Sequence, residues 1–494
     1  MSIDLSLDRL ERLLPHLPYT RPTVHIAGTN GKGSVSALLT SILMASNPPL
    51  RVGRFNSPHL VSVLDSITID DVNISEGIYY QVRKNVEDVD LKQGTKLTGF
   101  EILTMAALRI FETENVDIVV LEVGMGGRLD ATNIVPSSCI LVSALTAVDL
   151  DHQAFLGDNV ALIAREKASI ARQNKPFILG RQLHHEVEEV VSEVVAKSSG
   201  TLIRALEISV SERTLPKYSI LHNTSAAEPP TQIIDFRLQA FDTSAQAHFP
   251  LQGAHQLDNL GTALGVIESL LMFKYSDPDV YALHLRERIT KETVSNGIAD
   301  VKWRGRLSFH TISVPTPPSS TNLVVLVDGA HNPASAKTLG DYITSLLERS
   351  SSQDDADVVI PITYILSLSH SPPKTPLQTL SPVLPPSIGK STLLLRPSIA
   401  LLPFSPPEGM PWVKPVALES MRDTVRTLLP NLSDDDLWVA PNGSIEGKGN
   451  DPLRQALKWA ADRHRKSRGL VVLAGSLYLV ADFYRLLESG FEKH

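Results

Sequence analysis

Two stretches of the chain alternate short apolar runs with amphipathic segments. In residues 1–180, four apolar runs are separated by segments whose apolar positions recur at helical spacing. Such alternation is typical of βαβ units built on a mostly parallel sheet. The expected strands are Val24–Ala27, Ile118–Val123, Cys139–Ala144 and Phe177–Gly180, and the expected helices are Val35–Ala45, Phe100–Glu112 and Asn159–Arg172.

A second alternating stretch begins near Leu307, and the break before it predicts two α/β domains, 1–300 and 301–494. Its expected strands are Leu323–Val327, Val358–Ile365, Thr392–Leu395 and Leu470–Leu473, and its expected helices are Pro333–Leu347, Met421–Leu429, Leu453–His464 and Tyr478–Leu487.

Three regions have a different pattern. Residues 201–250 mix short β-like runs with polar turns, which predicts an antiparallel patch. Helices are expected at Gln256–Leu271 and Val280–Ile289. Proline and serine crowd residues 315–321 and 371–407, which we interpret as long loops.

Charge argues against a nucleic-acid-binding protein. The chain has 494 residues, with 46 basic and 54 acidic side chains and a net charge of −8, whereas proteins that grip a phosphate backbone show a basic patch. The basic run Arg463–Arg468 precedes Gly469, a pattern typical of a helix C-terminus.

Other features exclude further classes. No apolar run reaches the length of about 18 residues that a membrane-spanning helix needs, so we expect no membrane partner. The single cysteine, Cys139, excludes a disulfide framework and a cysteine-cluster zinc site. Acidic residues near the N-terminus argue against a secretory signal. We expect a cytosolic protein and leave a mitochondrial pool open.

A glycine-rich loop between an expected strand and an expected helix is the strongest short signal. Glycines let backbone N–H groups approach phosphate, and the helix N-terminus adds positive potential. The spacing departs from the general P-loop pattern, because Gly33 separates Lys32 from the hydroxyl residue. The alternative is a glycine-rich turn without a ligand. The loop comprises Gly28, Thr29, Asn30, Gly31, Lys32, Gly33 and Ser34.

Polar residues also follow other expected strands. Glu122 ends an apolar strand, where a carboxylate can hold Mg²⁺ against nucleotide phosphates or simply cap a loop. His152 follows the next strand along the chain, and a neutral imidazole can bind a metal. Lys167 lies on the helix after it, and its spacing alone assigns it no role.

A second strand–loop–helix signal lies in the C-terminal stretch. Asp328 and His331 follow the strand Leu323–Val327, where they could contact a ribose and a phosphate. Asn332 and Pro333 also suit a helix N-cap and first turn. Arg306, at the domain boundary, could close onto a terminal phosphate.

Taken in order, these motifs resemble the folylpolyglutamate synthase and dihydrofolate synthase family of the Mur-ligase superfamily. The resemblance implies an N-terminal P-loop ATPase-like domain, a C-terminal Rossmann-like domain and an active site in the cleft between them. The matching segments are His25–Ser34, Ser57–Leu60, Glu122–Asn133, Asp151–Gly157, Glu166–Ile170, Trp303–Leu307 and Asp328–Asn332.

The resemblance also implies residue roles. Lys32, Lys167, His152 and Arg306 would be catalytic, with Lys167 matching a lysine that relatives carry as a carbamate. Mg²⁺ would be held by Ser57, Glu122 and His152. ATP would be bound by the glycine-loop residues together with Asn259, Arg306, Asp328 and His331.

The implied reaction activates a substrate carboxylate with ATP and joins it to L-glutamate. Members use either dihydropteroate or reduced folates as the acceptor. Gly126–Asn133, Thr98–Thr104 and Glu408–Trp412 resemble dihydrofolate synthases, so dihydropteroate is the preferred expectation. A chain-extending folylpolyglutamate synthase and a bifunctional enzyme stay open.

Two other classes are weighed against the ligase. A catalytically inactive nucleotide-binding regulator should have lost Lys32, Glu122 or Lys167, and this chain keeps all three. A simple ATPase or kinase would not need the second motif at Asp328–Asn332. We therefore expect a monomeric enzyme whose partners are small molecules.

Overall fold

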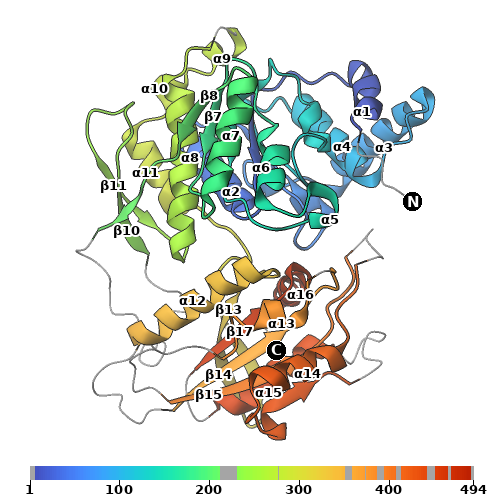
Figure 1. Cartoon of the computed structure of the whole chain (residues 1–494), viewed down its shortest axis with the longest axis vertical. Coiled ribbons are helices and arrows are strands. Elements are labelled where there is room, and N and C mark those ends of the chain that lie inside the picture. Colours follow the sequence, from blue (N-terminus) through green and yellow to red (C-terminus); the bar gives the residue numbers. More distant parts are fainter. Residues whose placement is uncertain are drawn as a thin grey trace. The chain divides into compact units, whose positions relative to one another are not determined.

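A computed structural model describes most of the chain. The described residues are 6–211, 231–275, 278–350, 359–372, 374–385, 394–407, 413–441, 451–465 and 469–490. They divide into two compact units, one formed by residues 6–211 and 231–302 and the other by residues from 303 onward. Figure 1 draws the first unit in blue to yellow-green and the second in yellow-orange to red. Residues 212–230, 358, 373, 386–393, 408–412 and 466–468, used in the sequence analysis, lie outside the described residues.

The first unit is built on an 8-stranded sheet in the order β4-β3-β2-β5-β1-β6-β7-β8. The six strands from β2 to β8 in this order pair in parallel, and β3 and β4 add an antiparallel edge. The strands are β1 (Thr23–Ala27), β2 (Val52–Phe55), β3 (Ile67–Ile69), β4 (Val72–Asn73), β5 (Ile118–Glu122), β6 (Ile140–Leu145), β7 (Pro176–Leu179) and β8 (Thr201–Arg204).

Every residue of the central strands β1, β5 and β6 is buried, as expected for a parallel sheet covered on both faces. Helices α2 and α8 contact these strands and each other. Further cores join α4 to β5 and join α6 and α7 to β7. The helices are α1 (Asp8–Leu13), α2 (Lys32–Met44), α3 (Glu76–Gln93), α4 (Gly99–Thr113), α5 (Gln153–Leu156), α6 (Val160–Ala168), α7 (His185–Lys197), α8 (Ala254–Met272), α9 (Pro278–Ala282), α10 (Leu285–Arg288) and α11 (Lys291–Asp300).

The antiparallel patch predicted at residues 201–250 is partly confirmed. Strands β9 (Ser209–Val210), β10 (Gln232–Phe236) and β11 (Ala245–Phe249) form a 3-stranded antiparallel sheet. Thr201–Arg204 instead extends the parallel sheet beside β7, because α7 carries the chain back to the same edge. The helix predicted over Val280–Ile289 is wrong as one element, since it breaks at His284, whose φ is 48°.

The second unit has a 6-stranded sheet in the order β12-β13-β17-β14-β15-β16, parallel except for the β12–β13 hairpin. Its strands are β12 (Ser308–Thr316), β13 (Ser319–Val327), β14 (Val359–Leu366), β15 (Leu394–Leu401), β16 (Leu437–Val439) and β17 (Leu470–Ala474). Its helices are α12 (Pro333–Ser350), α13 (Pro376–Leu380), α14 (Leu418–Leu428), α15 (Pro452–His464) and α16 (Leu477–Glu488).

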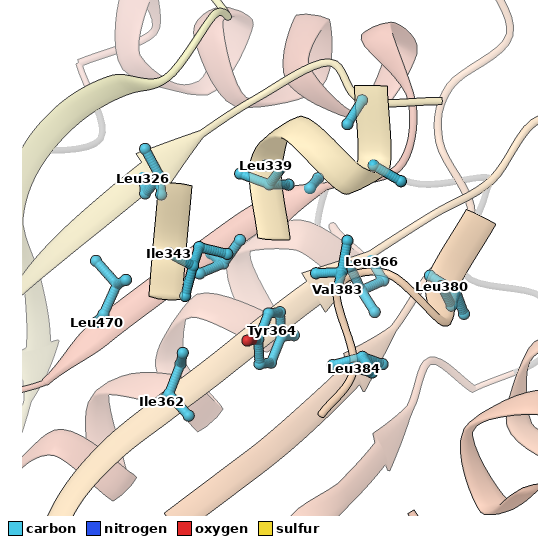
Figure 2. Packing of buried hydrophobic residues seen from close by; sticks show 14 of the residues in the cluster. Leu326, Leu339, Ile343, Ile362, Tyr364, Leu366, Leu380, Val383, Leu384 and Leu470 are labelled. Carbon is cyan, nitrogen blue, oxygen red and sulfur yellow. The ribbon is translucent and has the colours of Figure 1, made fainter. Parts of the chain in front are cut away.

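The apolar core of this unit lies between α12, α13 and the central strands. Figure 2 shows Leu339 and Ile343 of α12 above Ile362 and Tyr364 of β14, with Leu326 of β13 beside them. All five side chains are buried. This packing holds α12 against the sheet.

The two regions predicted as long loops are wrong in part. Residues 315–321 form the tip of the β12–β13 hairpin, which turns at Pro317-Pro318. Pro315 fits there because β12 is the edge strand, where a missing N–H leaves no ladder bond unmade. Within residues 371–407, α13 and β15 form because buried apolar positions outweigh the proline content.

Candidate active site

The glycine-rich loop joins β1 to α2 at the carboxyl edge of the first sheet. Gly31 is the N-cap of α2 and has φ 93°, a conformation that favours glycine. A Cβ at Gly31 would lie 2.2 Å from Oδ1 of Asn259, so α8 packs directly on the loop. The N–H groups of Lys32, Gly33 and Ser34 begin the helix and have no acceptor within it. This is the backbone arrangement that binds phosphate at a helix N-terminus.

The segment after β6 holds the loop in place. The Ala147 carbonyl accepts from the N–H groups of Thr29 at 2.9 Å and Asn30 at 3.2 Å. Thr146 Oγ1 donates to the Asn30 carbonyl at 2.7 Å. The Thr29 hydroxyl bonds the backbone of Asp149 at 3.1 Å. The Thr29 hydroxyl therefore anchors the loop to the segment after β6. The other hydroxyl of the loop, that of Ser34, lies in the first turn of α2.

Two lysines converge on the carbonyl of Gly28. Lys32 Nζ donates to it at 3.2 Å, and Lys167 Nζ donates to it at 3.0 Å. Burial, together with the positive charge of Lys32, lowers the pKa of Lys167 to about 7, although Asp151 and Asp130 oppose the shift. The fold thus brings Lys167, which the sequence alone could not assign, to the phosphate loop.

Glu122 is the last residue of β5, and Ser57 lies two residues after the neighbouring strand β2. Glu122 is buried, accepts a 2.5 Å hydrogen bond from Asn56 Nδ2 and lies 3.7 Å from Lys32 Nζ. Ser57 Oγ is buried and has no hydrogen-bond partner among the described residues. A carboxylate and a hydroxyl are hard oxygen ligands of the kind Mg²⁺ prefers, so these two residues fit a magnesium site.

His152 lies after β6 with φ 51°, and its Nε2 is 3.9 Å from Asp151 Oδ2. Its side chain is about half exposed, so the ring can turn toward a ligand. In the part of the chain that the structure describes, no three His, Cys, Asp or Glu side chains gather into a group that could hold a metal. A site with His152 and Glu122 therefore needs the Ser57 hydroxyl or non-protein ligands.

The loop after Glu122 packs against the end of α6. A Cβ on Gly127 would lie 2.7 Å from the Glu166 carbonyl and 3.0 Å from Cα of Lys167. Arg128 N donates to the same Glu166 carbonyl at 2.9 Å. Asp130 closes the loop by accepting from Met125 N at 2.8 Å. These contacts fix the backbone that carries Lys167.

In the second unit, Asp328 braces the chain at the end of β13. Its carboxylate accepts from the N–H groups of Leu307 and Ala330, each at 2.8 Å. Burial raises the pKa of Asp328, and the nearby Arg306 guanidinium opposes that rise. Arg306 passes so close to Gly329 that a Cβ there would be 2.3 Å from its Nη1. Arg306 and Asp328 thus form a cluster of opposite charges at the end of β13.

The start of α12 adds His331 to this group. Its Nδ1 lies 2.8 Å from the Gly329 carbonyl, which ties the ring to the loop after β13. Asn332 Oδ1 accepts from Ser335 N at 2.9 Å, so the N-cap with Pro333 in the first turn is confirmed.

Sequence reasoning missed two residues of the first unit. Thr146 donates a hydrogen bond to the Asn30 carbonyl, but it lies directly after β6 in a segment that carries no sequence motif. Gln256 lies three residues before Asn259 on α8, and helical spacing places both on one face. That spacing is the only signal that could have found Gln256.

Comparisons with known proteins agree along the whole chain. Residues 310–486 match a family model described as the C-terminal domain of dihydrofolate synthetase. The dihydrofolate synthetase of Saccharomyces cerevisiae is 32% identical over 500 residues, covering 99% of this chain and 99% of the relative. No helix among the described residues is long and apolar enough to cross a membrane.

Solved structures share the fold. One is Mycobacterium tuberculosis folylpolyglutamate synthase complexed with ADP and AMPPCP, with a TM-score of 0.71, 24% identity, and coverage of 97% of this chain and 95% of that one. Another is a bifunctional folylpolyglutamate synthase/dihydrofolate synthase with Mn, AMPPNP and L-glutamate bound, with a TM-score of 0.66, 23% identity, and coverage of 99% and 95%. Both cover both units of the chain.

Proposed function

Because the chain belongs to the dihydrofolate synthase/folylpolyglutamate synthase family, we propose that it joins L-glutamate to 7,8-dihydropteroate at the expense of ATP. The products would be 7,8-dihydrofolate, ADP and phosphate. The structural observation that carries this proposal is the phosphate loop, where Lys32, Lys167 and Glu122 meet beside the open N-terminus of α2.

The proposed reaction has two steps. A carboxylate oxygen of dihydropteroate attacks the γ-phosphorus of ATP, the bond to the ADP oxygen breaks, and an acyl phosphate forms. The glutamate amine then attacks the acyl carbon, loses a proton and expels phosphate. The first-turn N–H groups of α2 and the Lys32 ammonium stabilise the phosphoryl charge as it moves.

Ser57, Glu122 and His152 are the residues that would hold Mg²⁺. The unpartnered Ser57 hydroxyl and the buried Glu122 carboxylate support that assignment. When bound, the metal would neutralise charge on the transferring phosphoryl group. Glu122 Oε1 itself lies 3.7 Å from Lys32 Nζ, which keeps the ammonium close to where the phosphates would bind.

A carbamate on Lys167 would change a cation into an anion at this site. Only a neutral amine adds carbon dioxide, and a pKa of about 7 keeps a large share of the Lys167 amine neutral at physiological pH. The neighbouring Lys32 charge would then stabilise the anionic product. This supports the carbamate that the resemblance implies.

The remaining assignments rest on resemblance to the family. Asn259 would contact ATP near its adenine, Arg306 the γ-phosphate, and Asp328 and His331 the ribose and a phosphate. In the second unit the imidazole of His331 and the guanidinium of Arg306 are suited to anionic groups.

Dihydropteroate is the proposed acceptor because the full-length relative and the matching family model both carry the dihydrofolate synthetase name. Folylpolyglutamate synthase activity is the second candidate, favoured by the fold shared with such an enzyme. We place the enzyme in the cytosol as a monomer, and the single cysteine suits that reducing compartment.

Substrate omission tests the ligase chemistry. ADP release is followed with ATP, Mg²⁺, dihydropteroate and L-glutamate, and then with dihydropteroate or L-glutamate left out. The proposal expects sustained ADP release only when both dihydropteroate and L-glutamate are present. Equal ADP release without dihydropteroate and L-glutamate would instead indicate a simple ATPase.

A further inference from the structure

Gln256 is a fully buried amide that links two helices at the phosphate loop. It lies in the first turn of α8 with no exposed surface. Its Nε2 donates to Ser34 Oγ at 3.2 Å, and its Oε1 accepts from Asn259 Nδ2 at 3.0 Å. The nitrogen and the oxygen of this amide therefore each bond a residue of the proposed ATP site.

The two amides are oriented in one direction. Asn259 turns Oδ1 toward Gly31 and Nδ2 toward Gln256. Gln256 presents its oxygen to Asn259 and its nitrogen to Ser34. A serine hydroxyl has one proton and two acceptor sites. Since Gln256 fills one acceptor site of Ser34, the serine proton stays available to a phosphate oxygen.

We propose that Gln256 is a positioning residue for the nucleotide, acting through Ser34 and Asn259 without touching the substrate itself. It keeps the Ser34 hydroxyl a donor toward the phosphates and holds Asn259 against Gly31. This inference rests on the proposed function, because it takes the loop as the ATP site. It adds a second helix, α8, to the parts that shape that site.

Two substitutions disturb these hydrogen bonds in different ways, and both should weaken nucleotide binding. Gln256→Glu keeps the size but replaces the donor with an acceptor, so Ser34 must donate to the new carboxylate and not to phosphate. Gln256→Met removes both hydrogen bonds and leaves Ser34 and Asn259 free to rotate. Each lost hydrogen bond of this kind is worth about a tenfold change in an equilibrium constant.

The test measures binding of ATP with Mg²⁺ by titration calorimetry, together with KM for ATP and for the acid substrate. Both Gln256 variants should weaken ATP binding by about tenfold or more and leave KM for the acid substrate unchanged. Gln232→Glu is the matched control, because Gln232 is a partly buried glutamine on β10 whose Nε2 donates to the Leu251 carbonyl at 3.5 Å. It should bind ATP as the unaltered protein does.

A double-mutant cycle separates positioning from general structural damage. If Gln256 acts largely through Ser34, Gln256→Met adds little to the effect of Ser34→Ala. The inference would be overturned if the losses of ATP affinity caused by Gln256→Met and Ser34→Ala multiply fully in the double variant. It would also be overturned if ATP affinity is unchanged in both Gln256 variants. Should Gln256→Glu melt early, Gln256→Met decides the outcome. A failure of the unaltered protein to bind ATP would contradict the proposed function instead.

Discussion

Lys167 shows how a residue without a sequence signal gains chemistry from the fold. A lysine on a helix is ordinarily solvated, yet this one is buried and donates to Gly28 across 139 positions of sequence. Its lowered pKa follows from burial first and from Lys32 second. The sequence pattern could place Lys32, which lies in the glycine motif, but Lys167 was placed only by resemblance, because its neighbours come from β1 and the loop after β6.

Replacing Lys167 tests the carbamate. Lys167→Ala should lose ligation by roughly 10²–10³-fold, as when one charged group is removed from a transition state. Short carboxylates such as acetate or formate should restore part of the rate by filling the vacated anion position. Lys197→Ala, on the surface beside Glu193, serves as the control and should keep its activity. Full activity of Lys167→Ala without any addition would contradict the carbamate.

At the scale of elements, the ends of parallel strands gather the site. The apolar runs predicted β1, β5, β6 and β7 to within one or two residues, because buried parallel strands have a strong pattern. The pattern could not predict how the glycine loop 124–127 packs on α6, since that contact depends on backbone approach and not on hydrophobicity. It also missed β12, an edge strand that carries proline and polar residues.

Gly127 tests that packing. Gly127→Ala places a Cβ against the backbone of Glu166 and Lys167, which cannot move aside as a flexible side chain would. We expect a loss of stability of about 1–3 kcal/mol, typical of overpacking, and reduced ligation because Lys167 shifts. Thermal unfolding and initial rates measure both effects.

Gly77→Ala is the matched control for Gly127→Ala. Gly77 lies in the first turn of α3, and the nearest atom to its Cβ would be 4.0 Å away. The control should be as stable as the unaltered protein or slightly more so. Equal stability and equal ligation rates of the two variants would mean that the packing of the loop on α6 does not position Lys167.

At the scale of the whole molecule, each unit has its own core and its own polar network. In the second unit, Thr363 Oγ1 lies 2.9 Å from His464 Nε2 and 2.8 Å from Ser398 Oγ, all three buried. Burial, together with the charge of Arg463, lowers the pKa of His464 to about 4. The sequence suggested a helix end here but not a neutral buried histidine.

His464 predicts a pH dependence of the second unit. The unfolded histidine binds a proton below about 6.5, and the folded one only below about 4, so stability is lost as pH falls from 6.5 toward 4. Between pH 7 and 5 this group alone should cost about 2 kcal/mol. His464→Gln should remove that part of the loss.

The check is urea unfolding at pH 7 and pH 5, followed by tryptophan fluorescence. All 4 tryptophans lie at or beyond residue 303, so the signal reports the second unit. An identical pH dependence in His464→Gln and the unaltered protein would show that His464 does not titrate as its burial implies.

The central claim is the identity of the product, and product analysis by mass spectrometry tests it most directly. Purified protein is incubated with ATP, Mg²⁺ and L-glutamate, and with either dihydropteroate or tetrahydrofolate, beside a Lys32→Ala control. The account predicts dihydrofolate from the first acceptor and none from the Lys32 variant. Diglutamylated folate from the second acceptor alone would contradict the proposed acceptor, and no product from either acceptor would contradict the ligase itself.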